Sequence, residues 1–450
     1  MSRGDGESNW LPARVDAALA ALAGTGDVLL ALLPEPGRRM RLLLEAEVLE
    51  RRFPLPQERP PLFGMLVGIK DVLHVDGMPT RAGSAVPPEA LAGAEAGIVR
   101  RLRAQGALIL GKTVTAEFAF ADPGTTRNPH NHAHTPGGSS SGSAALVGAG
   151  LLPLAVGTQT VGSVIRPAAY CGAVGFKPSL GRLPLDGVLL VARSVDTLGL
   201  FARDAVSMRR AACALLVDSP GESRRESQGE LADERPDDGR DADTPSAGNS
   251  TAIRLLVPDG AFMAQVEPEA AVRFDTIVRR LRDAGVEVAP VSVFADLADI
   301  AGRHGRLVQR EFADAHAARF AQWGALYRPG SAYGVLAGRG VSDNDYAEAL
   351  ASTQQLRARM DIALATQRAD AWICPAATGP APSGHWSTGD PAMNIPFSHA
   401  GVPAITLPCD RVAAPGGDLP LGLQLAGAFG NDETLLALAV RLEALLRAAT

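Results

Sequence analysis

The segment from Gly137 to Ser163 constrains the fold more strongly than any other part of the chain. It begins with the cluster GGSSSG, continues through the small and apolar run SAALVGAGLLPLAVGT, and ends in a second glycine-serine turn, GTQTVGS. The run predicts a helix of small residues followed by a buried strand. Because small residues let backbone segments approach closely, we expect the two serine-bearing turns at one compact site rather than in a flexible linker.

From Leu62 onward, short apolar runs alternate with amphipathic stretches. FGMLVGI, ALILGKT and LLPLAVGT are typical of buried strands, whereas AGIVRRLRAQ has the pattern of a helix. Nearer the C-terminus, IRLLVPDG, ADAWICPAA, AITLPCD and PLGLQLAGA continue the strand pattern, and DETLLALAVRLEALLRAA predicts a closing amphipathic helix. This alternation predicts a layered α/β core.

Two regions differ from that core. Residues 1–61 contain two helical patterns and run into the proline-rich FPLPQERPPLFG, so they predict an N-terminal helical cap before a main domain at 62–450. Residues 219–251 carry one large apolar residue, Leu231, among charges, prolines and glycines. Such a segment cannot offset its ordering entropy, and we predict a disordered loop that interrupts the main domain.

Composition narrows the function classes. The chain is 46% hydrophobic, enough for a large core, and its formal net charge of -6 provides no basic surplus for nucleic acid. Four widely spaced cysteines form no zinc-ligand pattern and favour reduced, mostly buried thiols. Neither a signal peptide nor a long apolar segment is recognisable. We expect a soluble, cytoplasmic protein that binds neither membrane nor nucleic acid, with a homodimer as the default assembly.

Lys70 interrupts an apolar strand pattern, VGIKDVLHV. A charged ammonium would be costly there, and burial in a dry pocket can lower the pKa of a lysine from about 10.4 to near neutrality. A serine hydroxyl is a poor nucleophile until a base removes its proton. Lys70 and the two serine-bearing turns therefore favour a serine hydrolase that uses lysine as its base.

Two motifs match known patterns without the structural context that those patterns need. GALILGKT, residues 106–113, fits the phosphate-loop expression, but a helical stretch precedes it and its central residues are strand-like, so we expect no nucleotide there. GSSSG fits the elbow of α/β-hydrolases with Ser140 at its centre, and Asp390 and His399 follow in the order of a Ser-His-Asp triad. The polar loop before it lacks the required strand, so this alternative is the weaker one.

Three histidines, His130, His132 and His134, alternate in one segment without neighbouring carboxylates. This spacing is poor ligand geometry for a metal ion. We expect a solvated loop there, and no metal or cofactor in the protein.

With Lys70, Ser139 and Ser163 identified, the chain resembles the amidase signature family of serine hydrolases. The resemblance covers nearly everything from Leu62 onward apart from the charged loop. It implies an α/β/α sandwich with a large mixed β-sheet core covered by helices, so that residues 62–450 are an amidase domain. It rests on GIKDVLHVDGMPTRAGS, GALILGKTVTAEFAF, TTRNPHNHAHTPGGSSSGSAA, GTQTVGSVIRPAAYCGAVGFKPSLGRLP, GVPAITLPCD and LPLGLQLAG.

The resemblance also implies a Ser-Ser-Lys triad. Lys70 would be the base, Ser139 the bridging serine in a segment with a cis peptide bond, and Ser163, 24 residues further on, the nucleophile. Neutral Lys70 would take a proton from Ser139 while Ser139 takes one from Ser163, so that an acyl-serine forms on a small amide substrate. The oxyanion hole would consist of the backbone N–H groups of Thr160, Val161, Gly162 and Ser163.

Four positions depart from the family pattern. Gln159 replaces an aspartate, Val161 and Ser141 replace glycines, and Ile165 stands where the family has an arginine, which here comes one residue later as Arg166. The aspartate and arginine look like an ion pair in the family, and losing both leaves no stranded charge. Val161 requires a turn that a β-branched residue can adopt. We expect an active variant of the family.

Three other functions stay open. The chain could be an amidotransferase component that releases ammonia from glutamine for a partner enzyme modifying aminoacylated tRNA, the Ser140 hydrolase, or a non-catalytic binding protein with the same fold. For the substrate pocket we expect walls from residues 327–346 and 385–397, with Trp386 among them.

Overall fold

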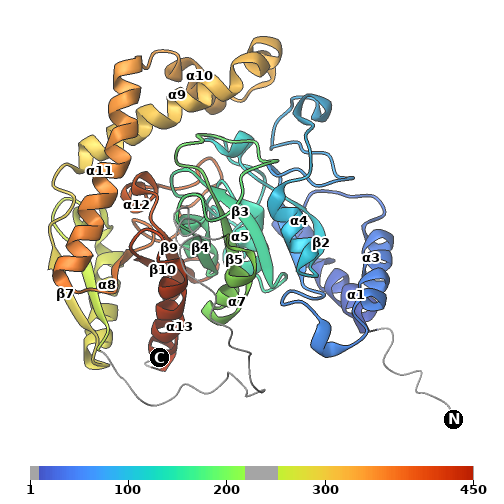
Figure 1. The fold of residues 1–450 in the computed structure, drawn as a ribbon, viewed down its shortest axis with the longest axis horizontal. Helices are drawn as coiled ribbons and strands as arrows, with labels where there is room; N and C mark the ends of the chain where they lie inside the picture. The colour runs from blue at the N-terminus through green and yellow to red at the C-terminus, as the bar shows by residue number, and fades with distance from the viewer. Residues whose placement is uncertain (1–9, 218–251, 449–450) are drawn as a thin grey trace, which may run out of the picture.

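A ten-stranded mixed β-sheet organises the molecule, and its strand order is β2-β1-β3-β5-β4-β9-β10-β8-β6-β7 (Figure 1). The computed structural model describes residues 10–217 and 252–448. The predicted loop at 219–251 therefore lies outside the described residues. The mixed sheet and its covering helices confirm the predicted α/β fold.

The two ends of the sheet are parallel and its middle is antiparallel. At one end β1 pairs in parallel with β2 and β3, and at the other β6 pairs in parallel with β7 and β8. Antiparallel pairing connects β3 through β5, β4, β9 and β10 to β8. The strands are β1 (Leu66–Lys70), β2 (Leu108–Thr113), β3 (Leu154–Gln159), β4 (Val174–Lys177), β5 (Thr197–Ala202), β6 (Arg254–Pro258), β7 (Glu287–Val291), β8 (Ala371–Pro375), β9 (Ala404–Val412) and β10 (Leu419–Ala426).

Helices cover both faces of this sheet. Figure 1 shows α3 beside β2 at one edge and α8 beside β7 at the other. The α-helices are α1 (Trp10–Leu22), α2 (Thr25–Leu29), α3 (Arg38–Arg52), α4 (Gly97–Ala104), α5 (Ser141–Gly148), α6 (Ile165–Cys171), α7 (Ala205–Leu215), α8 (Pro268–Asp283), α9 (Leu297–Trp323), α10 (Pro329–Gly338), α11 (Asp343–Gln367), α12 (Ile395–Ala400) and α13 (Asp432–Ala448).

Successive strand residues enter different hydrophobic clusters. On β5, Leu200 packs in the cluster that contains residues of α4, α7 and α13, whereas Phe201 packs in the cluster formed with α1, α3 and α5. On β8, Ile373 packs in the same cluster as Leu200, whereas Trp372 packs in a third cluster on the opposite face of the strand. Because side chains alternate across a strand, burial on both faces explains why these strands read as continuous apolar runs.

The N-terminal helices share a core with one edge of the sheet. Leu11 of α1 and Leu42 of α3 belong to the same buried cluster as Leu108 of β2 and Ala145 of α5. The helices expected in residues 1–61 are therefore present as α1 and α3. A domain boundary at residue 61 stays a prediction.

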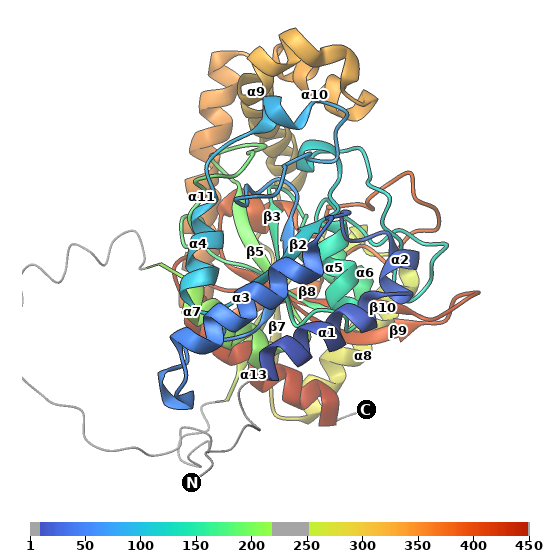
Figure 2. The same ribbon diagram turned by 90° about the vertical axis from the view of Figure 1, so that its right-hand side faces the viewer.

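Helices α9 and α10 stand at one end of the molecule, and α13 lies at the opposite end (Figures 1 and 2). No helix within residues 10–217 and 252–448 is long and apolar enough to cross a bilayer. The cysteines are unpaired; Cys171 and Cys374 are buried, but Cys213 is exposed, so the expectation of mostly buried thiols is only half met.

Candidate active site

Sheet order brings the predicted catalytic segments together. Lys70 is the last residue of β1, and β1 lies beside β3 in parallel, so the carboxyl ends of both strands meet at one edge. The turn with Ser163 follows β3 directly, and Ser139 lies two residues before the start of helix α5, which packs on β1 and β3. All three predicted residues therefore lie at segment ends near this edge.

Lys70 contacts Ser139 directly. Its Nζ lies 2.7 Å from Ser139 Oγ and 2.6 Å from Thr158 Oγ1, and the side chain is fully buried. Burial lowers the pKa of Lys70 well below its ordinary value of 10.5, while the charge of Asp196 acts in the opposite direction. The Gly138–Ser139 peptide bond is cis, as the family resemblance implies.

Asp196 is a site residue that sequence reasoning missed. Its Oδ1 accepts a hydrogen bond from Thr160 Oγ1 at 2.5 Å, and its Oδ2 accepts from the backbone N–H groups of Val191 and Ala192 at 2.8 and 3.0 Å. Burial raises its pKa to about 6, against the effect of these hydrogen bonds and of Lys70. In the sequence, Asp196 could have been recognised as the single carboxylate in the largely apolar segment VDTLGLF.

Ser163 faces a cavity of about 310 Å³. Its side chain is 9% exposed, and no described residue forms a hydrogen bond with its hydroxyl. Within the described chain, the backbone N–H groups of residues 160–163 also find no acceptor. Unpaired amides beside a serine hydroxyl form a suitable site for a developing oxyanion.

The two residues before Ser163 differ in what their positions tolerate. Val161 is not among the described non-glycine residues with positive φ, so its turn is one that a valine can adopt. At Gly162 a Cβ atom would lie 2.5 Å from Asn394 Oδ1 and 2.9 Å from Arg166 Nη1. Close approach therefore requires glycine at 162 but not at 161.

Gln159 takes the place of the family's aspartate without its charge. Its Oε1 accepts hydrogen bonds from the N–H groups of Val164 and Ile165 at 2.8 and 2.9 Å. Its Nε2 donates to Ser398 Oγ at 2.9 Å, and that hydroxyl donates to Val161 O at 2.5 Å. Ile165 packs in an apolar cluster. A neutral amide thus connects the turn to α6 and α12.

Arg166 supplies a buried positive charge to the wall of the cavity. Its side chain is 4% exposed; Nε donates to Thr388 O at 2.7 Å and Nη2 to Gly138 O at 2.8 Å. Its Nη1 is buried without a hydrogen-bond partner, and no described carboxylate forms an ion pair with the guanidinium. Burial lowers the pKa of Arg166, whereas Tyr170 and Asp390 raise it from a distance.

The Amidase family model matches residues 40–436, which include every residue of this site. The chain belongs to the amidase family. The protein is therefore a hydrolase that acts on amide C–N bonds, as the resemblance predicted.

Individual relatives agree with this assignment. The chain is 33% identical over 420 residues to a glutamyl-tRNA(Gln) amidotransferase subunit from Roseiflexus castenholzii, covering 84% of this chain and 81% of the relative. It is similar to a crystal structure of an amidase with a TM-score of 0.78 and 31% identity over 96% of each chain. The native peptide amidase from Stenotrophomonas maltophilia matches with a TM-score of 0.75 and 25% identity, over 98% of this chain and 94% of that one.

One wall of the amidase pocket differs from the prediction. Thr388, Gly389 and other residues of the predicted 385–397 segment line the cavity, but no residue of 327–346 does. Helix α9 provides the facing wall instead, and Trp386 is 79% exposed and does not line the cavity. The sequence pattern of this long helix alone did not indicate that it lines the cavity.

The Ser140 triad is not assembled in this amidase. Ser140 Oγ is buried and bonds the backbone of Thr158, donating to its carbonyl at 3.2 Å. His399 contacts His304 and a serine of α11, and Asp390 Oδ1 accepts from the backbone of Ala392. These three residues therefore do not form a nucleophile, base and acid in contact.

The phosphate-loop match lies in strand β2, as its strand-like residues suggested. Lys112 there forms a buried ion pair of 2.8 Å with Asp71, so its ammonium is already satisfied. Among the histidines, His130 and His134 are half-buried and bond the carbonyl oxygens of Cys171 and Ala381, while His132 is exposed. The expectation of a solvated loop is wrong for two of the three, because neighbouring backbone covers them.

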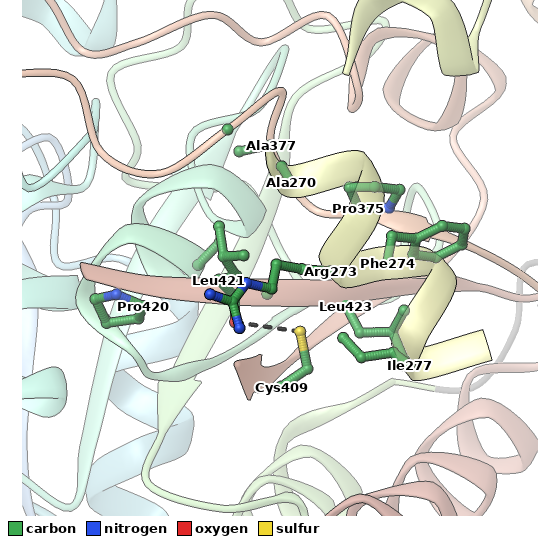
Figure 3. A pocket seen from close by; sticks show the side chains of 13 residues that line it. Ala270, Arg273, Phe274, Ile277, Pro375, Ala377, Cys409, Pro420, Leu421 and Leu423 are labelled. Atoms are coloured by element: carbon green, nitrogen blue, oxygen red, sulfur yellow. Dashed lines mark hydrogen bonds between the residues drawn. The ribbon is translucent and has the colours of Figure 1, made fainter. Parts of the chain in front are cut away.

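A smaller hollow lies between α8 and strands β9 and β10 (Figure 3). Its volume is about 20 Å³, against about 310 Å³ for the cavity at Ser163. Cys409 lies at its edge, donates to Leu421 O at 3.3 Å, and has a pKa raised by burial. This hollow is too small for an amide substrate, and the raised pKa of its thiol disfavours the reactive thiolate.

Proposed function

We propose that the protein hydrolyses a small carboxylic acid amide to the carboxylate and ammonia or an amine through an acyl-Ser163 intermediate. The observation that carries this proposal is the 2.7 Å contact between the buried Lys70 amine and Ser139 Oγ beside the cavity that Ser163 lines. A dry environment favours the neutral amine, which is the form that can accept a proton.

The proposed proton relay begins at the Lys70–Ser139 contact and requires the Ser163 hydroxyl, which bonds no described residue, to reach Ser139 Oγ. Neutral Lys70 accepts the hydroxyl proton of Ser139, and Ser139 takes the proton of Ser163 as the Ser163 oxygen attacks the amide carbon. The oxyanion of the tetrahedral intermediate meets the unpaired N–H groups of residues 160–163. The relay then runs in reverse, protonates the leaving nitrogen, and leaves the acyl group on Ser163. Water hydrolyses that ester by the same steps.

Arg166 favours a substrate that carries a carboxylate. A buried guanidinium without a counter-ion is costly, and an anionic ligand in the cavity relieves that cost. Nε and Nη2 already donate to Thr388 and Gly138, so a substrate carboxylate would bind through Nη1, the guanidinium nitrogen without a partner. We therefore propose that the substrate is the monoamide of a short dicarboxylic acid or a related anionic amide.

A second candidate is the release of ammonia from glutamine, as the name of the 33% identical relative suggests. Glutamine carries a carboxylate as well as a side-chain amide, so Arg166 is compatible with it. Glutaminase activity that requires a partner protein would favour this function. Comparable hydrolysis of other amides by the isolated chain would favour the free-standing enzyme.

The nucleophile is tested by covalent labelling with a fluorophosphonate probe. We expect Ser163→Ala to abolish the label and Ser140→Ala, a matched control at a buried serine, to retain most of it. Labelling that survives in Ser163→Ala and disappears in Ser140→Ala would contradict the proposed triad.

The substrate class is tested with two amides of similar length, succinamate and butyramide, which differ in the carboxylate. We expect ammonia release from succinamate to be preferred by about 10-fold or more, and the preference to vanish in Arg166→Met. Because Arg166 also holds Gly138 and Thr388, the ratio between the two substrates, rather than the absolute rate, reports carboxylate binding. An unchanged ratio in Arg166→Met would overturn the assignment.

A further inference from the structure

Helix α9 carries a carboxylate that bonds to the loop before Asp196. Glu311 is half-buried and lies three residues after Val308, which lines the Ser163 cavity. Its Oε2 accepts from the backbone N–H of Ser194 at 2.9 Å, and its Oε1 accepts from the Ser194 hydroxyl. Both hydrogen-bond donors of Ser194 therefore end on one side chain that lies 117 residues further along the sequence.

A third donor fixes the orientation of this carboxylate. The hydroxyl of Tyr346 on α11 donates to Glu311 Oε1 at 2.8 Å, and the guanidinium of Arg310 lies 5.6 Å from the centre of the Tyr346 ring. Burial and the bond to Glu311 raise the pKa of Tyr346, so its hydroxyl keeps the proton that it donates. One carboxylate can accept all three donors together, because each of its oxygens has two lone-pair sites.

The loop that Glu311 holds is closed by Asp196. The backbone N–H of Asp196 donates to Ala192 O at 2.8 Å, and Asp196 Oδ2 accepts from the N–H groups of Val191 and Ala192. Ser194 lies within this closed loop and is bonded to α9. Glu311 therefore fixes where the loop lies relative to the helix that forms the cavity wall.

Asp196 transmits this position to the turn before Ser163. Its Oδ1 accepts from Thr160 Oγ1 at 2.5 Å, and Thr160 begins the turn whose N–H groups are proposed to bind the oxyanion. Such donors stabilise an oxyanion only at hydrogen-bond distance from it, so a small displacement of the turn lowers the rate. Contacts thus connect Glu311 with Thr160 through two residues of the loop.

We propose that Glu311 is a positioning residue, which holds the 191–196 loop and, through it, the turn of residues 160–163 in the geometry that acylation of Ser163 needs. This inference rests on the proposed amide hydrolysis. Glu311 does not line the cavity, so it acts through the loop rather than on the substrate. Its loss should lower kcat and leave KM nearly unchanged, because the oxyanion forms in the transition state and not in the bound substrate.

The test compares Glu311→Ala with Glu311→Gln. We measure the rate constant of fluorophosphonate labelling at Ser163, which requires no knowledge of the substrate, together with kcat and KM on succinamate. We expect Glu311→Ala to lower the labelling rate and kcat by about 10-fold or more and to leave KM within about 3-fold. Glu311→Gln should restore most of the loss, because its oxygen can accept from the Ser194 N–H while its amide donates to the two hydroxyls.

Glu348→Ala is the matched control. It removes another carboxylate of α11 that bonds to α9, the one paired with Arg303 at 3.0 Å, and it should leave both rates within about 2-fold of wild type. An unchanged labelling rate in Glu311→Ala would overturn the inference. Equal losses in Glu311→Ala and Glu311→Gln would also overturn it, since they would mean that the charge matters and the hydrogen bonds do not.

A double-mutant cycle separates positioning from a general loss of structure. Thr160→Val keeps the shape of the side chain but removes the hydroxyl that bonds to Asp196. If Glu311 acts through this bond, adding Glu311→Ala to Thr160→Val should cost less than about 3-fold in labelling rate. Losses that multiply would show a different route and would overturn the inference.

Ser194→Ala provides the same cycle if Glu311→Ala does not fold, because it removes one of the two donors and leaves α9 unchanged. We expect a loss of labelling rate in the Ser194→Ala single variant and little further loss on top of Thr160→Val. No loss in the single variant would contradict the inference. Absence of labelling in the wild-type protein would instead refute the proposed function.

Discussion

The Lys70 amine and the Ser139 hydroxyl lie 2.7 Å apart, although 69 residues separate them in the chain. Their contact is buried at the edge where β1 and β3 end, and Thr158 of β3 is the second hydroxyl within reach of the amine. Burial thus brings the two groups into contact and also favours the uncharged amine that the proposed reaction needs.

The first prediction concerns the pH dependence of the reaction. The base is the neutral amine, so kcat/KM should fall as pH drops through the pKa of Lys70, which burial places well below 10.5. We expect the acidic limb of the profile to lie well below pH 10.5. Lys70→Arg, which keeps a positive charge that does not titrate, should lose about 1000-fold or more at every pH. A pH profile rising only near 10 would show that the amine is not desolvated in solution.

The second prediction concerns Asp196. Its negative charge raises the pKa of Lys70, so removing that charge in Asp196→Asn should move the acidic limb of the kcat/KM profile to lower pH. The Asn oxygen can accept from the N–H groups of Val191 and Ala192 while the Asn amide donates to the Thr160 hydroxyl, which limits damage to the turn. The profile is measured on succinamate with wild type as reference. A shift to higher pH would show that Asp196 acts on a group other than Lys70.

The third prediction contrasts the two positions before Ser163, the proposed nucleophile. Gly162→Ala should lower kcat by about 100-fold or more, because the new Cβ would meet Asn394 Oδ1 at 2.5 Å and displace the turn proposed to bind the oxyanion. Val161→Gly should change kcat by less than about 5-fold, because the valine has no positive φ to relieve. If Val161→Gly raised turnover from undetectable to substantial, the natural protein would be an inactive variant of the family.

The fourth prediction concerns the neutral link made by Gln159. Gln159→Leu keeps the volume but removes the acceptor for the N–H groups of Val164 and Ile165, so it should lower the free energy of unfolding by about 2–4 kcal/mol. Urea denaturation measures this change. Gln57→Leu, at an exposed position, serves as control and should stay within about 0.5 kcal/mol. Equal effects at both positions would exclude a structural role for the Gln159 hydrogen bonds.

Much of the fold could be predicted because the strands are buried on both faces. The runs containing Ile69, Ile109 and Val156 read as strands directly, since no polar alternation interrupts them. Strands β4 and β5 were not anticipated. Their short sequences, VGFK and TLGLFA, include glycine and polar residues, and they are stabilised as central strands by neighbours on both sides.

The sequence by itself determined the chemistry available at the site: a lysine in an apolar strand and two serines in glycine-rich turns at a set spacing. Only the tertiary structure decided which other groups meet them. Asp196 beside the Ser163 turn, the unpaired Nη1 of Arg166 and the wall formed by α9 depend on contacts between distant segments. Local periodicity carries information about burial and element type, whereas such contacts follow from strand order and helix packing, which no local pattern encodes.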